Sequence, residues 1–503
     1  MTFNSYLFLF IFMPVTAVIY WKLRKKGHTG ASLWFLIFAS LIFYGSVSLT
    51  GLAVFLFELF LNRLFAAGIL KNRENNRKAA GAILTAGIVT ELLILILFKY
   101  FGRLFIISGF KIEAPGISFY TFCGIMLLTE CFREGGMPEK EGIKALSLRE
   151  HLLYMTFFPK LLQGPIAAPY EMLSQKEGGS SLSFETLYRS LLLFSFGLFK
   201  KVILADTLGA AVDFGFTNLN ALHTGEALIV MLSYTLQLYF DFSGYCDMAS
   251  AAAAVFGFSL PLNFRSPYRA RNIIDFWKRW HITLTGFFTK YVYIPLGGSR
   301  KGKGRTILNI LIIFFLSGLW HGSGWNFLIW GMMHGIAFAL LRLIGFGNPK
   351  KKEKSPERSG KLPEEEGLPG AGTIIKTAFT FLYVNAAWVF FRAPSAKDAL
   401  HLFSDMGQFW FPRFNYNLAK CFQIPELWYA LKLLRIDRLS FGQYVPMALL
   451  LLFMTILVFR KKTADDYAKT CRIGAGNTFL MTLLMIWGVL SMTGVQTYLY
   501  VNF

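Results

Sequence analysis

Three of the seven histidines lie in one stretch of membrane-like sequence, residues 275–335. His281 follows the tryptophan-rich run "FWKRW", His321 ends an apolar run in "GLWHG", and His334 closes "WGMMHG". Ionisable side chains inside a membrane are energetically costly and usually serve a function. A histidine in apolar surroundings tends to be neutral, and a neutral imidazole can act as a general base. The stretch therefore predicts proton-transfer chemistry within a membrane.

The sequence around each histidine differs. If a helix begins near Ile307, His321 lies fourteen residues further on, about 21 Å into a hydrocarbon core of about 30 Å. The "HGSG" that follows predicts that His321 ends a helix at a glycine-lined bend, where a substrate can approach closely. We therefore expect His321 to be the base and His281 its partner. The alternative for each is a structural hydrogen bond between helices, and His334 fits that alternative better.

Helical periodicity predicts one helix around His281. One face of that helix would hold Trp277, Trp280, His281, Leu284 and Phe288, at i, i+3, i+4, i+7 and i+11. We expect this helix to lie in or dip from the membrane interface, with His281 pointing inward among the tryptophans. Trp280 and Trp320, each next to a candidate histidine, are possible supporting residues.

A second group of polar residues lies in "LQLYFDFSGYCDMA". Gln237, Asp241 and Tyr245 follow one another at i, i+4 and i+8, which predicts a polar stripe along one span. Buried acids of this kind line a water-filled pathway or pair with a cation. The stripe would also suit a transporter or polysaccharide export channel, an alternative from another class. Structural pairs with Lys or Arg explain three further acids equally well: Glu58, Glu91 and Asp206.

Composition indicates a membrane protein. Of 503 residues, 54% are hydrophobic and 16% charged, with a mean hydropathy of +0.47, whereas soluble proteins carry about 25% charged residues. The net charge is +22, and basic residues form short clusters between apolar runs, for example at 22–26, 71–78 and 133–149. Such clusters predict an outside N-terminus, cytoplasmic basic loops and no nucleic-acid partner. The five cysteines form no CxxC or disulfide framework.

Apolar runs of spanning length recur along the chain: 5–21, 31–50, 51–70, 79–101, 115–130, 186–204, 226–245, 306–320, 326–346, 373–391, 443–459 and 478–500. With about 20 residues per span, they predict an all-α polytopic protein with roughly ten to twelve transmembrane or re-entrant helices. The first run should be retained as a span. The proline-containing segment 154–173 is expected to be re-entrant, and the charged segment 348–372 to be a linker.

Missing motifs narrow the chemistry. The chain has no GxSxG, HExxH or GxxxxGK[ST], so serine hydrolase, zinc protease and P-loop mechanisms lack their signatures. No two histidines are spaced at i, i+3 or i+4, so we expect no compact metal site.

An ordered series of motifs resembles the membrane-bound O-acyltransferase family, in the branch of bacterial alginate O-acetylases and their cell-wall relatives. The motifs are "GISFYTF" (116–122), "TFFPKLLQGPI" (156–166), "GLFKKVILAD" (197–206), "LQLYFDFSGYCDMA" (236–249), "NFRSPYRARNIIDFWKRWHITL" (263–284), "YIPLGG" (293–298) and "LSGLWHGSGWNFLIWGMMHG" (316–335). The resemblance covers residues 115–345, and "WVFFRAPSAKDAL" (388–400) with Phe503 extends it.

The resemblance implies a helical bundle around a central funnel or tunnel, with His321 and His281 as the two family histidines. It implies that acetyl passes from a cytosolic thioester such as acetyl-CoA, with no bound cofactor, to an acceptor outside. It also implies a bacterial cytoplasmic membrane, an extracytoplasmic SGNH-type acyltransferase partner and a polysaccharide acceptor. D-alanyl transfer to teichoic acid from a carrier protein is the near alternative. The chain would form one membrane domain, divided into N-terminal helices (1–114), core (115–346), cytoplasmic linker (347–372) and C-terminal helices (373–503).

The sequence departs from the family pattern in two places. Thr289 and Lys290 stand where the family usually has an Arg-Asp pair, and Cys123 stands where it usually has Gln. The first difference changes the charge close to His281. We therefore expect it to affect the identity of the donor or the partner more than the chemistry of the reaction.

Overall fold

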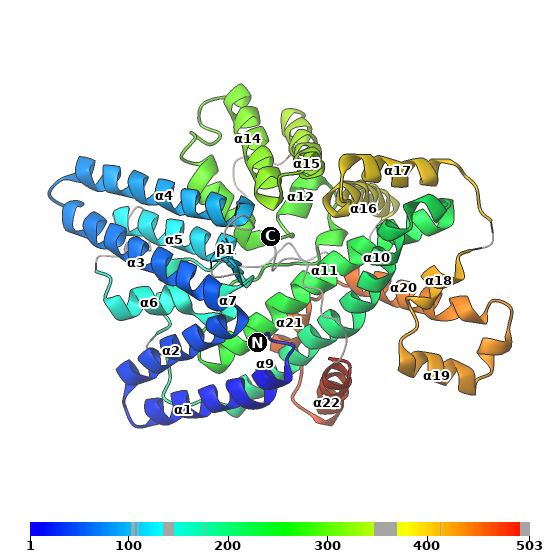
Figure 1. The fold of residues 1–503 in the computed structure, drawn as a ribbon, viewed down its shortest axis with the longest axis horizontal. Coiled ribbons are helices and arrows are strands. Elements are labelled where there is room, and N and C mark those ends of the chain that lie inside the picture. The colour runs from blue at the N-terminus through cyan, green and yellow to red at the C-terminus, as the bar shows by residue number, and fades with distance from the viewer. Residues whose placement is uncertain are drawn as a thin grey trace. The chain divides into compact units, whose positions relative to one another are not determined.

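The computed structural model describes residues 1–101, 106–107, 110–133, 145–176, 178–346, 370–412 and 414–492, and helices dominate these ranges (Figure 1). Two short strands, β1 (Ile106–Ile107) and β2 (Phe110–Lys111), pair antiparallel. Most of the predicted charged linker, part of the basic loop 133–149 and the terminal Phe503 lie outside the described residues.

Within the described ranges, six helices are long and apolar enough to cross a membrane. They are α2 (Thr29–Val47), α3 (Leu49–Asn72), α4 (Arg77–Tyr100), α14 (Lys303–His321), α15 (Trp325–Leu343) and α16 (Ala371–Arg392). Shorter apolar helical stretches, at Ile117–Phe132, Gly442–Val458 and Ala475–Leu490, coincide with other predicted spans. The all-α polytopic fold is thus confirmed, while the number of crossings and the central tunnel stay predictions.

The chain divides into two compact units. The first contains Met1–Asp206, Leu238–Asn263 and Lys462–Phe503, and the second contains Thr207–Gln237 and Phe264–Lys461. Two helices, α10 (Asp206–Thr217) and α11 (Thr224–Val255), run across the boundaries between these ranges. The fourfold division predicted from sequence stays a prediction.

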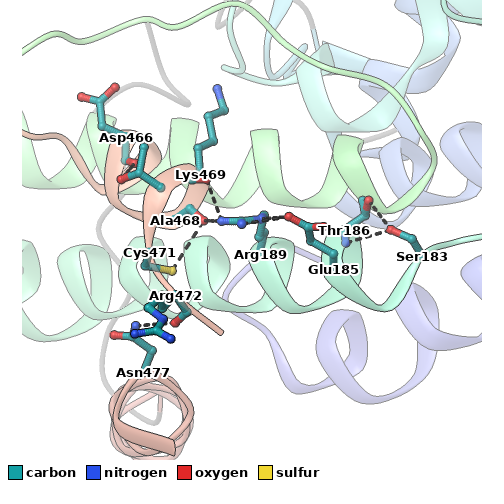
Figure 2. A network of polar contacts seen from close by, with 11 residues as sticks. Ser183, Glu185, Thr186, Arg189, Asp466, Ala468, Lys469, Cys471, Arg472 and Asn477 are labelled. Atoms are coloured by element: carbon teal, nitrogen blue, oxygen red, sulfur yellow. Dashed lines mark hydrogen bonds and ion pairs between the residues drawn. The ribbon is translucent and has the colours of Figure 1, made fainter. Parts of the chain in front are cut away.

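The first unit holds the N-terminal helices and the last ones. Besides α2, α3 and α4, its helices are η1 (Phe8–Phe12), α1 (Met13–Lys25), α5 (Ile117–Phe132), α6 (Leu148–Thr156), α7 (Phe158–Leu161), α8 (Pro169–Leu173), α9 (Phe184–Leu198), η3 (Phe199–Ala205), α21 (Ala464–Thr470) and α22 (Ala475–Leu490). Arg189 on α9 donates to the carbonyls of Ala468 and Lys469 at 2.6 and 2.7 Å, which ties α9 to the end of α21 (Figure 2).

The second unit is built around α14, α15 and α16. Its other helices are η4 (Leu219–Ala221), η5 (Pro267–Arg269), α12 (Ile273–Trp277), α13 (Ile282–Phe288), η6 (Thr289–Tyr293), α17 (Ala396–Gly407), α18 (Tyr416–Lys420), α19 (Pro425–Leu433), η8 (Ile436–Arg438), η9 (Gly442–Tyr444) and α20 (Val445–Val458).

The proline-containing segment 154–173 forms short helices, α7 and α8, separated by irregular chain. Protein side chains satisfy backbone groups there: Tyr154 donates to the Ala167 carbonyl at 2.9 Å, and the Phe158 amide donates to Ser40 Oγ at 3.2 Å. Irregular backbone at membrane depth is stable only where protein or water provides such partners. Whether the segment is re-entrant stays a prediction.

Candidate active site

His321 is the last residue of α14, as the sequence predicts. Its side chain is buried, and aromatic rings surround it: the Trp320, Trp330 and Phe391 ring centroids lie 4.3, 5.0 and 4.8 Å from that of His321. Trp330 comes from α15 and Phe391 from α16, so three helices of the second unit enclose the imidazole. The helix begins at Lys303 rather than near Ile307, so His321 lies further from its start than the sequence estimate.

Glycines let α14 and α15 pack side by side (Figure 1). A Cβ added to Gly318 would lie 2.6 Å from the Phe327 carbonyl oxygen, and one added to Gly331 would overlap the Phe314 carbonyl oxygen. Small residues permit this backbone contact between membrane helices. At the bend after His321, the Phe327 ring fills the space beside Gly322. That glycine therefore makes room for Phe327, whereas we expected it to make room for a substrate.

His334 lies on α15 and is fully buried. Its Nδ1 accepts a hydrogen bond of 3.3 Å from Trp277 Nε1. A neutral imidazole that accepts at one nitrogen carries its hydrogen on the other, so His334 has its hydrogen on Nε2. The Trp330 ring contacts both His334, at 5.3 Å between centroids, and His321. His334 is thus separated from His321 by one ring, and its structural role stays a prediction.

The single helix predicted around His281 is wrong. The chain forms α12, then a turn, then α13, and His281 has left-handed backbone angles, φ 44° and ψ 54°. The Arg279 carbonyl accepts a hydrogen bond from the Arg265 amide at 2.9 Å, so it does not continue the helical ladder. The five residues expected to point inward are nevertheless all buried. Burial also lowers the pKa of His281 to about 3, which keeps this imidazole, outside the spanning helices, neutral.

A chain of tryptophans connects the neighbours of the two candidate histidines. Trp280, next to His281, lies 5.0 Å from Trp388 between centroids, and Trp388 stacks on Trp330 at 5.6 Å. Trp330, Trp388 and Phe391 were not among the predicted site residues. The motif "WVFFRAPSAKDAL" contained two of them, but in a chain that is 17% aromatic their type alone gave no signal.

The polar stripe predicted from the sequence lies on α11. Gln237, Asp241 and Tyr245 are all buried on this one helix. Asp241 forms an ion pair of 2.6 Å with Lys201, and Lys201 also pairs with Asp206 at 2.8 Å. Of the two alternatives that the sequence leaves for Asp241, the ion pair agrees with pairing to a cation, and Asp206 likewise has a lysine partner. Lys201 was not predicted as a partner.

Glycines again bring the helices of this ion-pair cluster together. A Cβ on Gly197 would lie 2.7 Å from the Gly244 carbonyl oxygen, and one on Gly244 would lie 2.8 Å from that of Gly197. A second ion pair, between the partly exposed side chains of Lys200 and Asp247 at 2.6 Å, lies beside this contact. The motifs "GLFKKVILAD" and "DFSGYCD" thus act as one structural element.

The other two acids, Glu58 and Glu91, lie close to each other, and each accepts a hydrogen bond from an uncharged side chain, so the alternative of a pair with Lys or Arg does not hold for them. Thr121 donates to Glu58 at 3.0 Å, and Asn62 donates to Glu91 at 2.6 Å. Gly124 on α5 leaves room for the Asn62 and Glu91 groups. These contacts join α3, α4 and α5, which lie side by side (Figure 1).

Two of the three residues that depart from the family pattern, Thr289 and Cys123, have environments that the structure describes. Thr289 lines a cavity of about 170 Å³ in the second unit, and Trp277, the donor to His334, forms part of the same wall. Cys123, in the first unit, accepts a hydrogen bond of 3.3 Å from Lys160 Nζ. Thr289 therefore lines the same cavity as the tryptophan that donates a hydrogen bond to His334.

In the part of the chain that the structure describes, no group of three His, Cys, Asp or Glu side chains is arranged to hold a metal ion. The candidate site consists of three buried histidines, one of which is hydrogen-bonded to tryptophan, and their aromatic surroundings.

Known proteins are similar to this chain over much of its length. Residues 85–359 match the family model described as "MBOAT, membrane-bound O-acyltransferase family". The peptidoglycan O-acetyltransferase of Helicobacter pylori is 34% identical over 80% of this chain and 79% of its own length. A protein named probable alginate O-acetylase, from Pseudomonas putida, is 33% identical over 81% of each chain. The teichoic acid D-alanyltransferase of Bacillus subtilis is 30% identical over 47% of this chain and 61% of its own. The chain belongs to the membrane-bound O-acyltransferase family and is an O-acyltransferase.

Proposed function

We propose that this enzyme moves an acetyl group from a cytosolic thioester, acetyl-CoA, towards hydroxyl groups of a cell-surface polysaccharide, with His321 as general base. The observation that carries the proposal is the position of His321, buried at the end of a spanning helix among rings from three helices. The relatives named as O-acetylating enzymes support the acetyl group and the polysaccharide, because they align over four fifths of this chain.

In the proposed reaction, neutral His321 accepts the proton of an acceptor hydroxyl while that oxygen attacks the thioester carbonyl. The new C–O bond forms, the C–S bond breaks, and the imidazolium returns the proton to the departing thiolate. General-base help of this kind contributes about 10² to 10⁴ in rate. Binding both substrates in one site adds the advantage of proximity. We assign His281 to positioning the donor or stabilising the oxyanion, and His334 to holding Trp277.

The proposed setting is the cytoplasmic membrane of a bacterium, with the chain crossing it many times. An extracytoplasmic SGNH-type acyltransferase would take the acetyl group and pass it to the polysaccharide. D-alanyl transfer from a carrier protein is the second candidate, because teichoic acid D-alanyltransferases share about half of this chain. Supplying purified protein with labelled acetyl-CoA or with carrier-bound D-alanine separates the two.

The first prediction concerns His321. Purified His321→Gln, which keeps a polar side chain of similar size, should lose about 10² to 10⁴ of the acetyl-transfer rate. The measurement is release of free thiol from acetyl-CoA together with transfer of labelled acetyl. The control is His401→Gln, because His401 is partly exposed and pairs with Asp405 away from the aromatic cluster. A wild-type rate in His321→Gln, with a normal unfolding temperature, would exclude His321 as the base.

A further inference from the structure

Two adjoining cavities in the first unit form one groove. The first, about 520 Å³, lies between α1, α9, α11 and α22 and has an almost wholly apolar lining that includes Phe10, Leu191 and Ile486. The second, about 470 Å³, adds Lys22 and Lys25. Four residues line both cavities: Pro14, Ala17, Leu187 and Val255. The groove is therefore continuous, with an apolar part and a basic end.

One face of α1 forms the length of this groove. The residues of α1 that line it are Met13, Pro14, Ala17, Val18, Trp21, Lys22 and Lys25. At about 1.5 Å per residue, Trp21 lies about 12 Å and Lys25 about 18 Å along the helix from Met13. Half of a hydrocarbon core of about 30 Å is about 15 Å. The part of α1 that lines the apolar cavity is thus comparable in length with one leaflet, and a helix crossing that leaflet would bring the lysines to the level of its headgroups.

The basic end has charge available for a ligand. Lys22 and Lys25 are exposed, and neither forms an ion pair with any acidic side chain that the structure describes. Arg24 between them is instead buried and donates to Tyr20 and to the Lys176 carbonyl. Both lysines belong to the basic cluster 22–26, which is expected on the cytoplasmic side. Anionic lipids are enriched there, and basic pockets between membrane helices bind their headgroups.

The walls of the groove are fixed by specific contacts. Trp21 donates to the Val255 carbonyl at 2.8 Å, which holds α1 against the end of α11. The Tyr6 hydroxyl donates to the Val489 carbonyl on α22 at 3.0 Å. Arg189 holds α9 to the end of α21 (Figure 2). The groove is thus pre-formed between anchored helices, as a ligand site usually is.

We propose that this groove binds one anionic glycerophospholipid, with an acyl chain in the apolar part and the phosphate between Lys22 and Lys25. A membrane helix from a partner protein would fill the apolar part equally well, but it would leave both lysines without a counter-charge at headgroup level. The charge pattern therefore favours the lipid.

The test is native mass spectrometry of the full chain, released from nanodiscs of phosphatidylglycerol or of phosphatidylcholine. Wild type should retain one phosphatidylglycerol molecule and no phosphatidylcholine. Lys22→Glu/Lys25→Glu should lower that retention by about tenfold or more. Lys26→Glu is the matched control, since Lys26 is exposed in the same cluster but does not line the groove, and it should retain the lipid.

A second variant tests the apolar part without changing the charge. Ala17→Phe places a ring where the two cavities meet and should also release the lipid, with an unfolding temperature close to that of wild type. The proposal is overturned if both lipids are retained equally, or if the double lysine variant keeps phosphatidylglycerol as wild type does. It is also overturned if Ala17→Phe releases a co-purified protein subunit instead of a lipid.

Discussion

His281 has a backbone conformation that costs about 1–3 kcal/mol for a residue other than glycine. Histidine tolerates it better than a β-branched residue does. We therefore expect His281→Asn to fold with near-normal stability, because asparagine also adopts the left-handed region, and to lose transfer activity. His281→Val should unfold at a lower temperature. Thermal unfolding in detergent and steady-state transfer kinetics separate the two effects.

The role assigned to His281 has a kinetic signature. If it positions the donor, His281→Asn should raise KM for acetyl-CoA, and if it stabilises the oxyanion, kcat should fall. A stable His281→Asn protein with unchanged kcat and KM would remove His281 from the site.

For single residues, the sequence predicts those features of backbone conformation that depend on adjacent residues. The glycines after His321 are adjacent to it, so the end of α14 was predictable. The break before His281 depends on the Arg265 amide, which reaches the Arg279 carbonyl across a turn. Helical spacing within 277–288 contains no information about that contact. It also could not show that Trp330 and Trp388 stack.

Among the elements, the packing of α14 on α15 depends on backbone contact at Gly331. Gly331→Ala should destabilise the protein by about 1–3 kcal/mol, because the methyl group would overlap the Phe314 carbonyl and force the helices apart. Gly304→Ala, on the same helix pair, is the control: no atom lies within 4 Å of its added Cβ. Its stability should stay constant or rise by up to about 1 kcal/mol. Unfolding in detergent measures both, and equal stability of the two variants would contradict the packing argument.

The contact of η3 with α11 provides a test of buried charge. Lys201→Met leaves Asp241 without its ion-pair partner and should cost about 3–5 kcal/mol. Removing both charges in Lys201→Met/Asp241→Leu should restore part of that loss. Lys469→Met, in an exposed pair with Asp465, should cost less than about 1 kcal/mol. If the double variant loses as much stability as the sum of the losses in Lys201→Met and Asp241→Leu, or more, the two charges do not stabilise each other as argued.

The apolar runs predicted where the helices lie more accurately than they predicted where the helices end. The run 226–245 predicted one span, but α11 continues to Val255 because the alanine-rich segment "ASAAAAV" is strongly helix-forming although less apolar. The packing of α9 and η3 on α11 could not be predicted, since Gly197 on α9 and Gly244 on α11 are far apart in sequence and their contact arises only on folding.

For the whole molecule, the basic clusters predict the orientation in the membrane. In a chain with its native cysteines replaced, Leu49→Cys, at the exposed start of α3, should react with a membrane-impermeant thiol reagent applied to intact cells. Glu74→Cys, in the basic loop 71–78, should react only after the cells are permeabilised. The reverse pattern would invert the predicted topology, and with it the side from which the thioester reaches the enzyme.

The order of the chain in the first unit affects how the protein is made. The unit closes only when residues from 462 onward join the N-terminal helices, as the hydrogen bond from Tyr6 to Val489 illustrates. Contacts so distant in sequence form late, and a chain made from its N-terminus inserts its first helices long before α22 exists. During synthesis, the face of α1 that later lies near α22 therefore stays uncovered until α22 has been made. A chain truncated before α22 would keep this face of α1 exposed, and quality-control proteases can recognise such a face. We therefore expect the truncated protein to be degraded, with loss of its transferase activity.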